Sequence, residues 1–186
     1  MDIEQIERKE NQEQHSCGLS RRSFLFYSGG ALTTGTVMLQ IPGVLHAQEA
    51  KVATYPRKLI AKMSQLEMDQ PVIFNYPDDG RNSNCLLVKL GQKAGGGIGG
   101  QNDVVAFNTI CTHQGGPLLG TYKAEYKTLG QCPFHLTTYD LTRYGIIVSG
   151  QAYQSLPQVI LELKGDNIYA VGVMGLIFGR NNNHIG

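Results

Sequence analysis

Two stretches of this chain decide its fold: Cys111-Thr112-His113 and Cys132-Pro133-Phe134-His135. Each supplies one thiol and one imidazole, and 18 residues separate His113 from Cys132. Turn-forming residues follow the first motif, in the run Gln114-Gly115-Gly116-Pro117, and a proline lies inside the second. Two loops that each carry one Cys and one His predict a shared metal site.

This mixed arrangement resembles the ligand set of a Rieske [2Fe–2S] centre, in which two thiolates hold one iron and two imidazoles hold the other. The predicted ligands are Cys111, His113, Cys132 and His135, with one cluster per chain. A structural zinc site and chance placement are the alternatives, although zinc sites usually pair Cys with Cys and His with His. A catalytic oxygenase would need two further His for its mononuclear iron, and only His184 lies outside the motifs and the leader.

The residues after His135 extend the resemblance. The run Leu136-Thr137-Thr138-Tyr139 is similar to the Rieske pattern of a hydroxyl residue and an aromatic residue behind the last ligand. It implies that Thr137 donates a hydrogen bond to a bridging sulfide and Tyr139 to a cysteine sulfur, which favours the reduced cluster. Many Rieske proteins also join the two loops by a disulfide, but Gly116 and Phe134 occupy those positions here.

Beyond residue 47 the chain is a series of short apolar runs, rich in β-branched and aromatic residues and separated by turn residues. No segment keeps a 3.6-residue period for three turns. The pattern predicts an all-β fold, a Rieske-type antiparallel β-sandwich or barrel with an inserted cluster-binding part at about residues 107–141. The expected strands cover residues 72–76, 85–90, 104–110, 144–149, 159–163, 168–173 and 176–178.

A glycine-rich stretch matches the dinucleotide-binding pattern G-x-G-x-x-G at Gly95, Gly97 and Gly100. A nucleotide site also needs a helix after the loop, so that the helix N-terminus faces the pyrophosphate. Here another apolar strand follows, beginning at Val104. The stretch is therefore predicted to be a loop between two strands.

The first 47 residues indicate an export leader, which leaves residues 48–186 as the Rieske domain. The run Ser20-Arg21-Arg22-Ser23-Phe24-Leu25 precedes a moderately apolar stretch that ends near a small-residue cleavage site at Ala47. This resembles a twin-arginine signal and predicts a periplasmic protein; a retained leader would instead associate the protein with the membrane. An amphipathic core helix is the alternative reading. A net charge of +1 argues against a nucleic-acid partner.

Four segments of the mature chain are similar to the small subunit of arsenite oxidase: residues 74–78, 88–91, 102–106 and 170–180. The resemblance implies an electron-transfer subunit of an oxidoreductase, with no substrate-converting site of its own. Its partners would be a molybdopterin-containing large subunit and a periplasmic cytochrome c or small copper protein. The imidazole edges of His113 and His135 would form the electron port.

Two related functions remain open on the sequence alone. The same small subunit could serve another molybdenum enzyme that acts on an oxyanion, such as an iodate reductase, because the substrate pocket lies on the partner. A quinol-oxidising Rieske subunit of a bc complex is the other. Gln151 disfavours it, because it stands within the stretch that corresponds to the Gly-Pro-Ala-Pro loop of those proteins.

Overall fold

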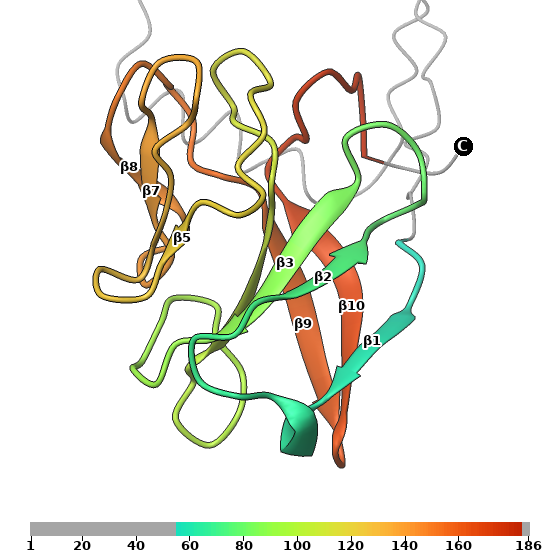
Figure 1. Ribbon diagram of the computed structural model, residues 1–186. Helices are drawn as coiled ribbons and strands as arrows, with labels where there is room; N and C mark the ends of the chain where they lie inside the picture. Colours follow the sequence, from blue (N-terminus) through green and yellow to red (C-terminus); the bar gives the residue numbers. More distant parts are fainter. Residues whose placement is uncertain (1–54, 184–186) are drawn as a thin grey trace, which may run out of the picture. The chain divides into compact units, whose positions relative to one another are not determined.

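The computed structural model describes residues 55–183, so the predicted leader and its cleavage site at Ala47 lie outside the described residues. The described chain forms ten β-strands in two antiparallel sheets and one 3-10 turn, η2 (Met63–Gln65) (Figure 1). The larger sheet has the order β1 (Lys58–Lys62), β10 (Asn167–Met174), β9 (Gln158–Lys164), β4 (Val104–Asn108), β3 (Asn84–Lys89) and β2 (Val72–Asn75). The smaller sheet has the order β5 (Tyr122–Lys123), β6 (Thr128–Leu129), β7 (Thr138–Asp140) and β8 (Ile146–Ser149). The predicted all-β class is confirmed.

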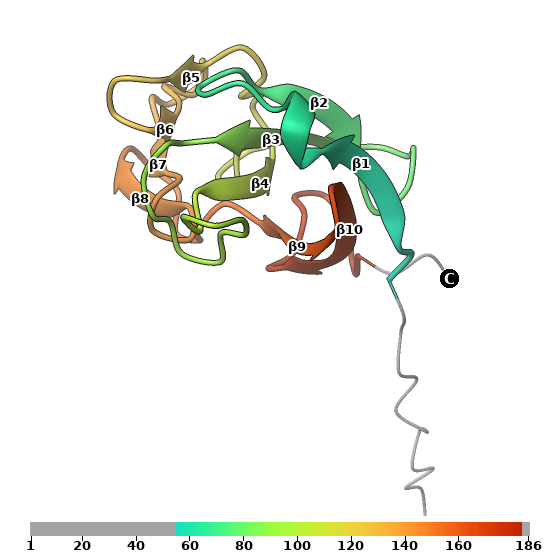
Figure 2. The same ribbon diagram turned by 90° about the horizontal axis from the view of Figure 1, so that it is seen from below.

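The larger sheet curls until its two edge strands approach each other. Lys58 on β1 donates from Nζ to the carbonyl oxygen of Asn75 on β2 over 3.0 Å. Close by, the Tyr76 hydroxyl donates to the Pro56 carbonyl over 2.8 Å. The strands thus surround a common interior as a nearly closed barrel (Figure 2).

Strands β3 and β4 separate two hydrophobic cores. Because successive side chains of a strand point to opposite faces, Leu86, Val88 and Phe107 enter the core shared with the smaller sheet. Their neighbours Leu87 and Ala106 enter the barrel interior. All five are almost completely buried. Both faces of β3 and β4 are therefore covered, which explains why these strands are continuous apolar runs in the sequence.

A polar link ties the smaller sheet to the barrel. Lys127, in the turn between β5 and β6, places Nζ 2.7 Å from both carboxylate oxygens of Asp69, and Tyr122 donates to the same carboxylate over 2.6 Å. Burial alone would raise the pKa of Asp69, but the bonds from Lys127 and Tyr122 outweigh it and leave this pKa below its ordinary value. The ion pair therefore stays charged at neutral pH.

Several details differ from the expectations. Residues 176–178 were expected to form a strand, but they lie in an irregular segment outside both sheets, where Ile177 is buried and its N–H donates to the Asn183 side chain over 3.0 Å. Strands β1, β5, β6 and β7 were not predicted. The smaller sheet also includes β8, so it extends past residue 141, the expected end of the cluster-binding part.

The glycine-rich stretch is a loop between β3 and β4, which pair antiparallel, as the sequence indicated. It has no helix to face a nucleotide. Elsewhere in residues 55–183, too, the structure contains no helix of the length and hydropathy that a membrane crossing requires.

A second ion pair anchors the C-terminal segment. Arg180 donates to both carboxylate oxygens of Asp78 over 2.8 Å, and to the Ser83 hydroxyl over 2.6 Å. The guanidinium and then the Ser83 hydroxyl hold the pKa of Asp78 far below its usual range. A depressed carboxyl pKa stabilises the fold above the pKa of the unfolded state, and this stability is lost as the pH falls.

We expect Asp78→Asn to lower the free energy of unfolding at pH 7 by about 1–3 kcal/mol, because Arg180 then lacks its partner while the site is only partly exposed. Below about pH 4 the difference between wild type and variant should shrink. Asp79→Asn is the matched control, since the Asp79 side chain is 81% exposed. Denaturant titrations at several pH values would contradict the assignment if both variants behaved alike.

Candidate metal centre

The two predicted ligand loops have the same backbone fold. In the first, the Cys111 N–H donates to the Gly116 carbonyl over 2.8 Å; in the second, the Cys132 N–H donates to the Thr137 carbonyl over 2.8 Å. In both, the carbonyl of the cysteine accepts from the amide four residues later, over 2.9 Å. Each loop therefore turns back onto its own cysteine and presents the following residues outward.

The residue four positions after each cysteine makes this turn in the left-handed region. Gly115 has φ +71° and Leu136 has φ +58°. Glycine adopts this conformation freely, whereas for Leu136 it costs about 1–2 kcal/mol. In the sequence, glycines signal the first turn and Pro133 signals a turn in the second loop, but no residue type signals the left-handed conformation of Leu136.

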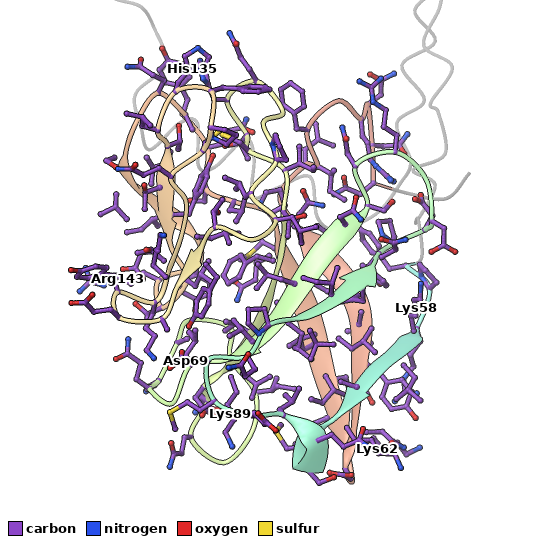
Figure 3. The ribbon with its side chains drawn as sticks, viewed as in Figure 1. Lys58, Lys62, Asp69, Lys89, His135 and Arg143 are labelled. Atoms are coloured by element: carbon purple, nitrogen blue, oxygen red, sulfur yellow. The ribbon has the colours of Figure 1, made fainter. Side chains whose placement is uncertain are left out.

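The structure brings all four predicted ligands together at one end of the domain. Cys111 and Cys132 are buried, and the ring centroids of His113 and His135 lie 4.6 Å apart, nearly perpendicular. His135 is exposed at the tip that Figure 3 labels. In the described part of the chain no three His, Cys, Asp or Glu side chains gather closely enough to hold one ion; the four groups form a deep pair of thiols and an outer pair of imidazoles.

The chemistry of this set fits a two-iron cluster. The Nδ1 atom of His113 is buried without a hydrogen-bond partner, a costly state that coordination of iron would relieve. Burial and then the adjacent Cys111 sulfur act to raise the pKa of the Cys132 thiol, although backbone N–H groups oppose them. Ferric iron would displace both thiol protons and offset the repulsion between the two neighbouring, negatively charged sulfurs. We therefore retain Cys111, His113, Cys132 and His135 as the predicted ligands.

The two predicted hydrogen-bond donors are both fully buried. Tyr139 is fully buried on β7 with its hydroxyl 3.3 Å from Cys111 Sγ. Burial raises the pKa of Tyr139 well above its ordinary value, so the hydroxyl keeps the proton it would donate. Thr137 is also fully buried; its Oγ1 accepts from the Gln151 N–H over 3.2 Å, which leaves its own proton to donate. The position of Tyr139 suits its predicted role, and the role of Thr137 stays a prediction.

Phe134 occupies the space beside Gly116. A Cβ atom at Gly116 would lie 3.1 Å from the Phe134 ring and 2.5 Å from Cys132 Sγ. The described cysteines are free thiols, so close packing, and no disulfide among them, joins the two loops. Phe134 is nevertheless 56% exposed, so it shields the site from one side only.

Residues 150–157, here termed the covering loop, make hydrogen bonds to both ligand loops. The Gln154 carbonyl accepts from the Thr112 hydroxyl over 2.8 Å, and Gln151 reaches Thr137 as described above. Sequence reasoning assigned no role to Thr112 or Gln154. Their contact joins residues 42 positions apart, and no local pattern reports such a pair.

Comparison with known proteins gives the class of the chain. The Rieske [2Fe–2S] domain family matches residues 59–160. The chain belongs to this family, so the predicted cofactor, a [2Fe–2S] cluster, is confirmed, and the protein is an electron carrier.

Individual relatives show more specifically which members of the family this chain is similar to. Iodate reductase subunit IdrB from Denitromonas iodatirespirans is 54% identical over 169 residues, which cover 90% of this chain and 88% of the relative. The subunit of the same name from Pseudomonas sp. (strain SCT) is 51% identical over 171 residues, 91% of this chain and 86% of the relative. Among solved structures, the soluble domain of the Rieske protein II (soxF) from Sulfolobus acidocaldarius has a TM-score of 0.59 at 26% identity, over 69% of this chain and 83% of that one. The two curated relatives carry the name of the alternative considered above, iodate reductase, rather than that of arsenite oxidase.

We expect Thr137→Val and Tyr139→Phe each to lower the reduction potential by about 60–130 mV. Each removes one hydrogen bond to charged sulfur, worth about 1.5–3 kcal/mol, and the reduced cluster loses more than the oxidised one. Protein-film voltammetry measures the change. Thr138→Val is the matched control, because its side chain leaves the opposite face of β7. Potentials that fall equally in all three variants would show that neither side chain reaches a sulfur.

Gly116→Ala should prevent stable cluster binding, because the added Cβ has no room beside Cys132 Sγ and the Phe134 ring. The expected result is loss of most of the iron and acid-labile sulfide, measured per purified chain. Gly100→Ala is the control, since a Cβ there meets nothing within 4 Å. Full iron content in Gly116→Ala would mean that the loops move apart easily.

Proposed function

We propose that this protein is the Rieske electron-transfer subunit of an iodate reductase, working with a molybdopterin-containing large subunit. The observation that carries the proposal is the 54% identity, over 90% of the chain, with a subunit of that name. The candidate metal centre supports it, because its ligands and donors are suited to holding one electron. Substrate conversion would take place on the large subunit.

The direction of electron flow follows from the reaction class. A reductase consumes electrons, so this subunit would accept them singly from a periplasmic carrier, such as a c-type cytochrome or small copper protein, and pass them to the large subunit. In an arsenite oxidase, the function indicated by the sequence resemblance, the same cluster would carry electrons the opposite way. Both directions use the exposed edge of His135, flanked by His113.

The surface around the cluster supports a permanent protein partner. The cluster face, defined here as Phe134, His135, Leu136 and Tyr153, is exposed; Tyr153 is 92% exposed. Residues 104–122, 128–139 and 144–161, which include both ligand loops and the covering loop, contain no Asp, Glu, Lys or Arg. In Figure 3 the labelled Lys58, Lys62, Asp69, Lys89 and Arg143 all lie away from His135. Depletion of charge together with exposed aromatic groups is typical of the centre of a stable interface.

We also propose that the protein works in the periplasm, exported through the twin-arginine leader predicted at residues 1–47. Export of a folded, cluster-loaded subunit suits a site whose ligands come together only in the finished fold. Cell fractionation of the wild type and of an Arg21→Lys/Arg22→Lys variant tests this: the variant should accumulate in the cytoplasm. Equal periplasmic amounts would contradict the assignment.

The decisive experiment for the substrate is to purify the complex with its native partner and to assay both reactions. With a reduced dye as electron donor, the complex should consume iodate; with an oxidised acceptor, it should leave arsenite unchanged. Arsenite oxidation without iodate reduction would establish the other function. A complex that carries Cys132→Ser should lose turnover with the protein carrier at least tenfold, because the electron relay is broken.

The uncharged cluster face leads to a prediction about assembly. Association through charged surfaces weakens steeply with ionic strength. Here the dissociation constant for the large subunit should change less than about threefold between 50 and 500 mM salt, measured by calorimetry. Tyr153→Ala should weaken binding at least tenfold, as exposed Tyr anchors commonly do. Tyr126→Ala, an exposed Tyr between Glu125 and Lys127, is the control and should bind normally.

A further inference from the structure

A chain of polar groups runs from a ligand sulfur to the covering loop. Tyr139 Oη lies 3.3 Å from Cys111 Sγ and 2.9 Å from Thr112 Oγ1. Thr112 Oγ1 in turn lies 2.8 Å from the Gln154 carbonyl oxygen. The backbone N–H of Thr112 also donates to Tyr139 Oη, over 3.1 Å. All of these distances are within hydrogen-bond range.

This series of polar groups has fewer hydroxyl protons than contacts that need one. Three contacts need a hydroxyl proton: sulfur to Tyr139, Tyr139 to Thr112, and Thr112 to Gln154. Thr112 and Tyr139 own one hydroxyl proton each. If Tyr139 gave its proton to the sulfur while Thr112 gave its own to Gln154, two oxygen lone pairs would face each other across 2.9 Å. One contact must therefore go without a proton.

Two arrangements avoid this repulsion. In the loop-holding arrangement, Tyr139 donates to Thr112 and Thr112 donates to the Gln154 carbonyl, so the Cys111 sulfur receives nothing. In the sulfur-donating arrangement, Tyr139 donates to Cys111 Sγ and Thr112 donates to Tyr139, so the Gln154 carbonyl turns to solvent. The sulfur and the covering loop compete for the same protons.

The charge on the sulfur decides the competition. A reduced cluster holds one more electron, and a hydrogen bond to a more negative acceptor is stronger. We infer that Thr112 is a positioning residue that couples the oxidation state of the cluster to the hold on the covering loop. One-electron reduction by the redox partner rotates both hydroxyls from the loop-holding to the sulfur-donating arrangement, and no proton leaves the pair. This requires only that Cys111 binds the cluster, and it does not depend on the substrate of the complex.

The coupling is reciprocal. If reduction loosens the covering loop, then any partner that draws the loop away favours the reduced cluster and raises its potential. Tyr153, the most exposed side chain of the cluster face, is the immediate neighbour of Gln154. Docking of a partner at Tyr153 can thus affect the Cys111 sulfur through three consecutive contacts: Gln154 with Thr112, Thr112 with Tyr139, and Tyr139 with Cys111.

Hydrogen–deuterium exchange of the covering loop in the cluster-loaded protein tests this, with the oxidation state set by a chemical reductant and the β9–β10 hairpin as internal reference. The wild-type loop should exchange about 2- to 10-fold faster in the reduced state, the effect of losing one net hydrogen bond. Equal exchange in both states would overturn the inference.

We expect two variants to have opposite effects on loop exchange and on the reduction potential. Thr112→Val removes the donor to Gln154, so the loop should exchange rapidly in both states, and the potential should rise because Tyr139 then donates only to sulfur. Tyr139→Phe leaves Thr112 free to hold the loop, so exchange should be slow in both states and the potential should fall. Thr112→Ser keeps the hydroxyl and should restore the dependence on oxidation state.

A purely structural role for Thr112 would produce a different pattern. In that case the wild-type loop would exchange at the same rate in both oxidation states. Thr112→Val would speed exchange equally in both states, and the potential would not rise. Iron and sulfide content, measured on each variant, separates loss of the cluster from loss of coupling. A wild-type dependence that survives in Thr112→Val would also overturn the inference.

Discussion

The backbone bonds that return each ligand loop to its own cysteine govern the arrangement of this end of the molecule. They bury Cys111 and Cys132 and direct the two imidazoles outward. The chain then enters β7, where the Tyr139 hydroxyl lies 3.3 Å from Cys111 Sγ. The two cysteines and the Tyr139 hydroxyl therefore lie inside, whereas the His135 imidazole is exposed at the surface.

Isolation from charge is the second property of the site. The segments that contain the ligand loops and the covering loop have no Asp, Glu, Lys or Arg, and the ion pairs of Asp69 and Asp78 involve other segments. The polar side chain in contact with the Cys111 sulfur is the Tyr139 hydroxyl, which carries no net charge. Its orientation can respond to an added electron at little cost, since no ion has to be moved or neutralised.

The sequence predicted the parts of the structure that depend on local pattern. Motif spacing indicated four candidate ligands, which the fold brings to one end of the domain. Apolar runs indicated the central strands, because strands covered on both faces require continuous hydrophobic residues. Strands β5 and β6 have two residues each and leave no periodic signal. Residues 176–178 are apolar because Ile177 fills the barrel interior from an irregular segment, which a pattern of residue types does not distinguish from a strand. The Thr112–Gln154 contact arises from tertiary packing alone.

Placing the two cores on opposite faces of β3 and β4 makes strand register a determinant of redox chemistry. A slip of one residue would exchange every side chain between the cores and send Phe107 into the barrel, while the first ligand loop, four residues along the chain at Cys111, would emerge on the wrong side. Correct strand pairing in the barrel therefore positions the metal centre, since an error in this pairing leaves the two cysteines unable to meet. Cluster assembly thereby tests whether the distant strands have paired correctly.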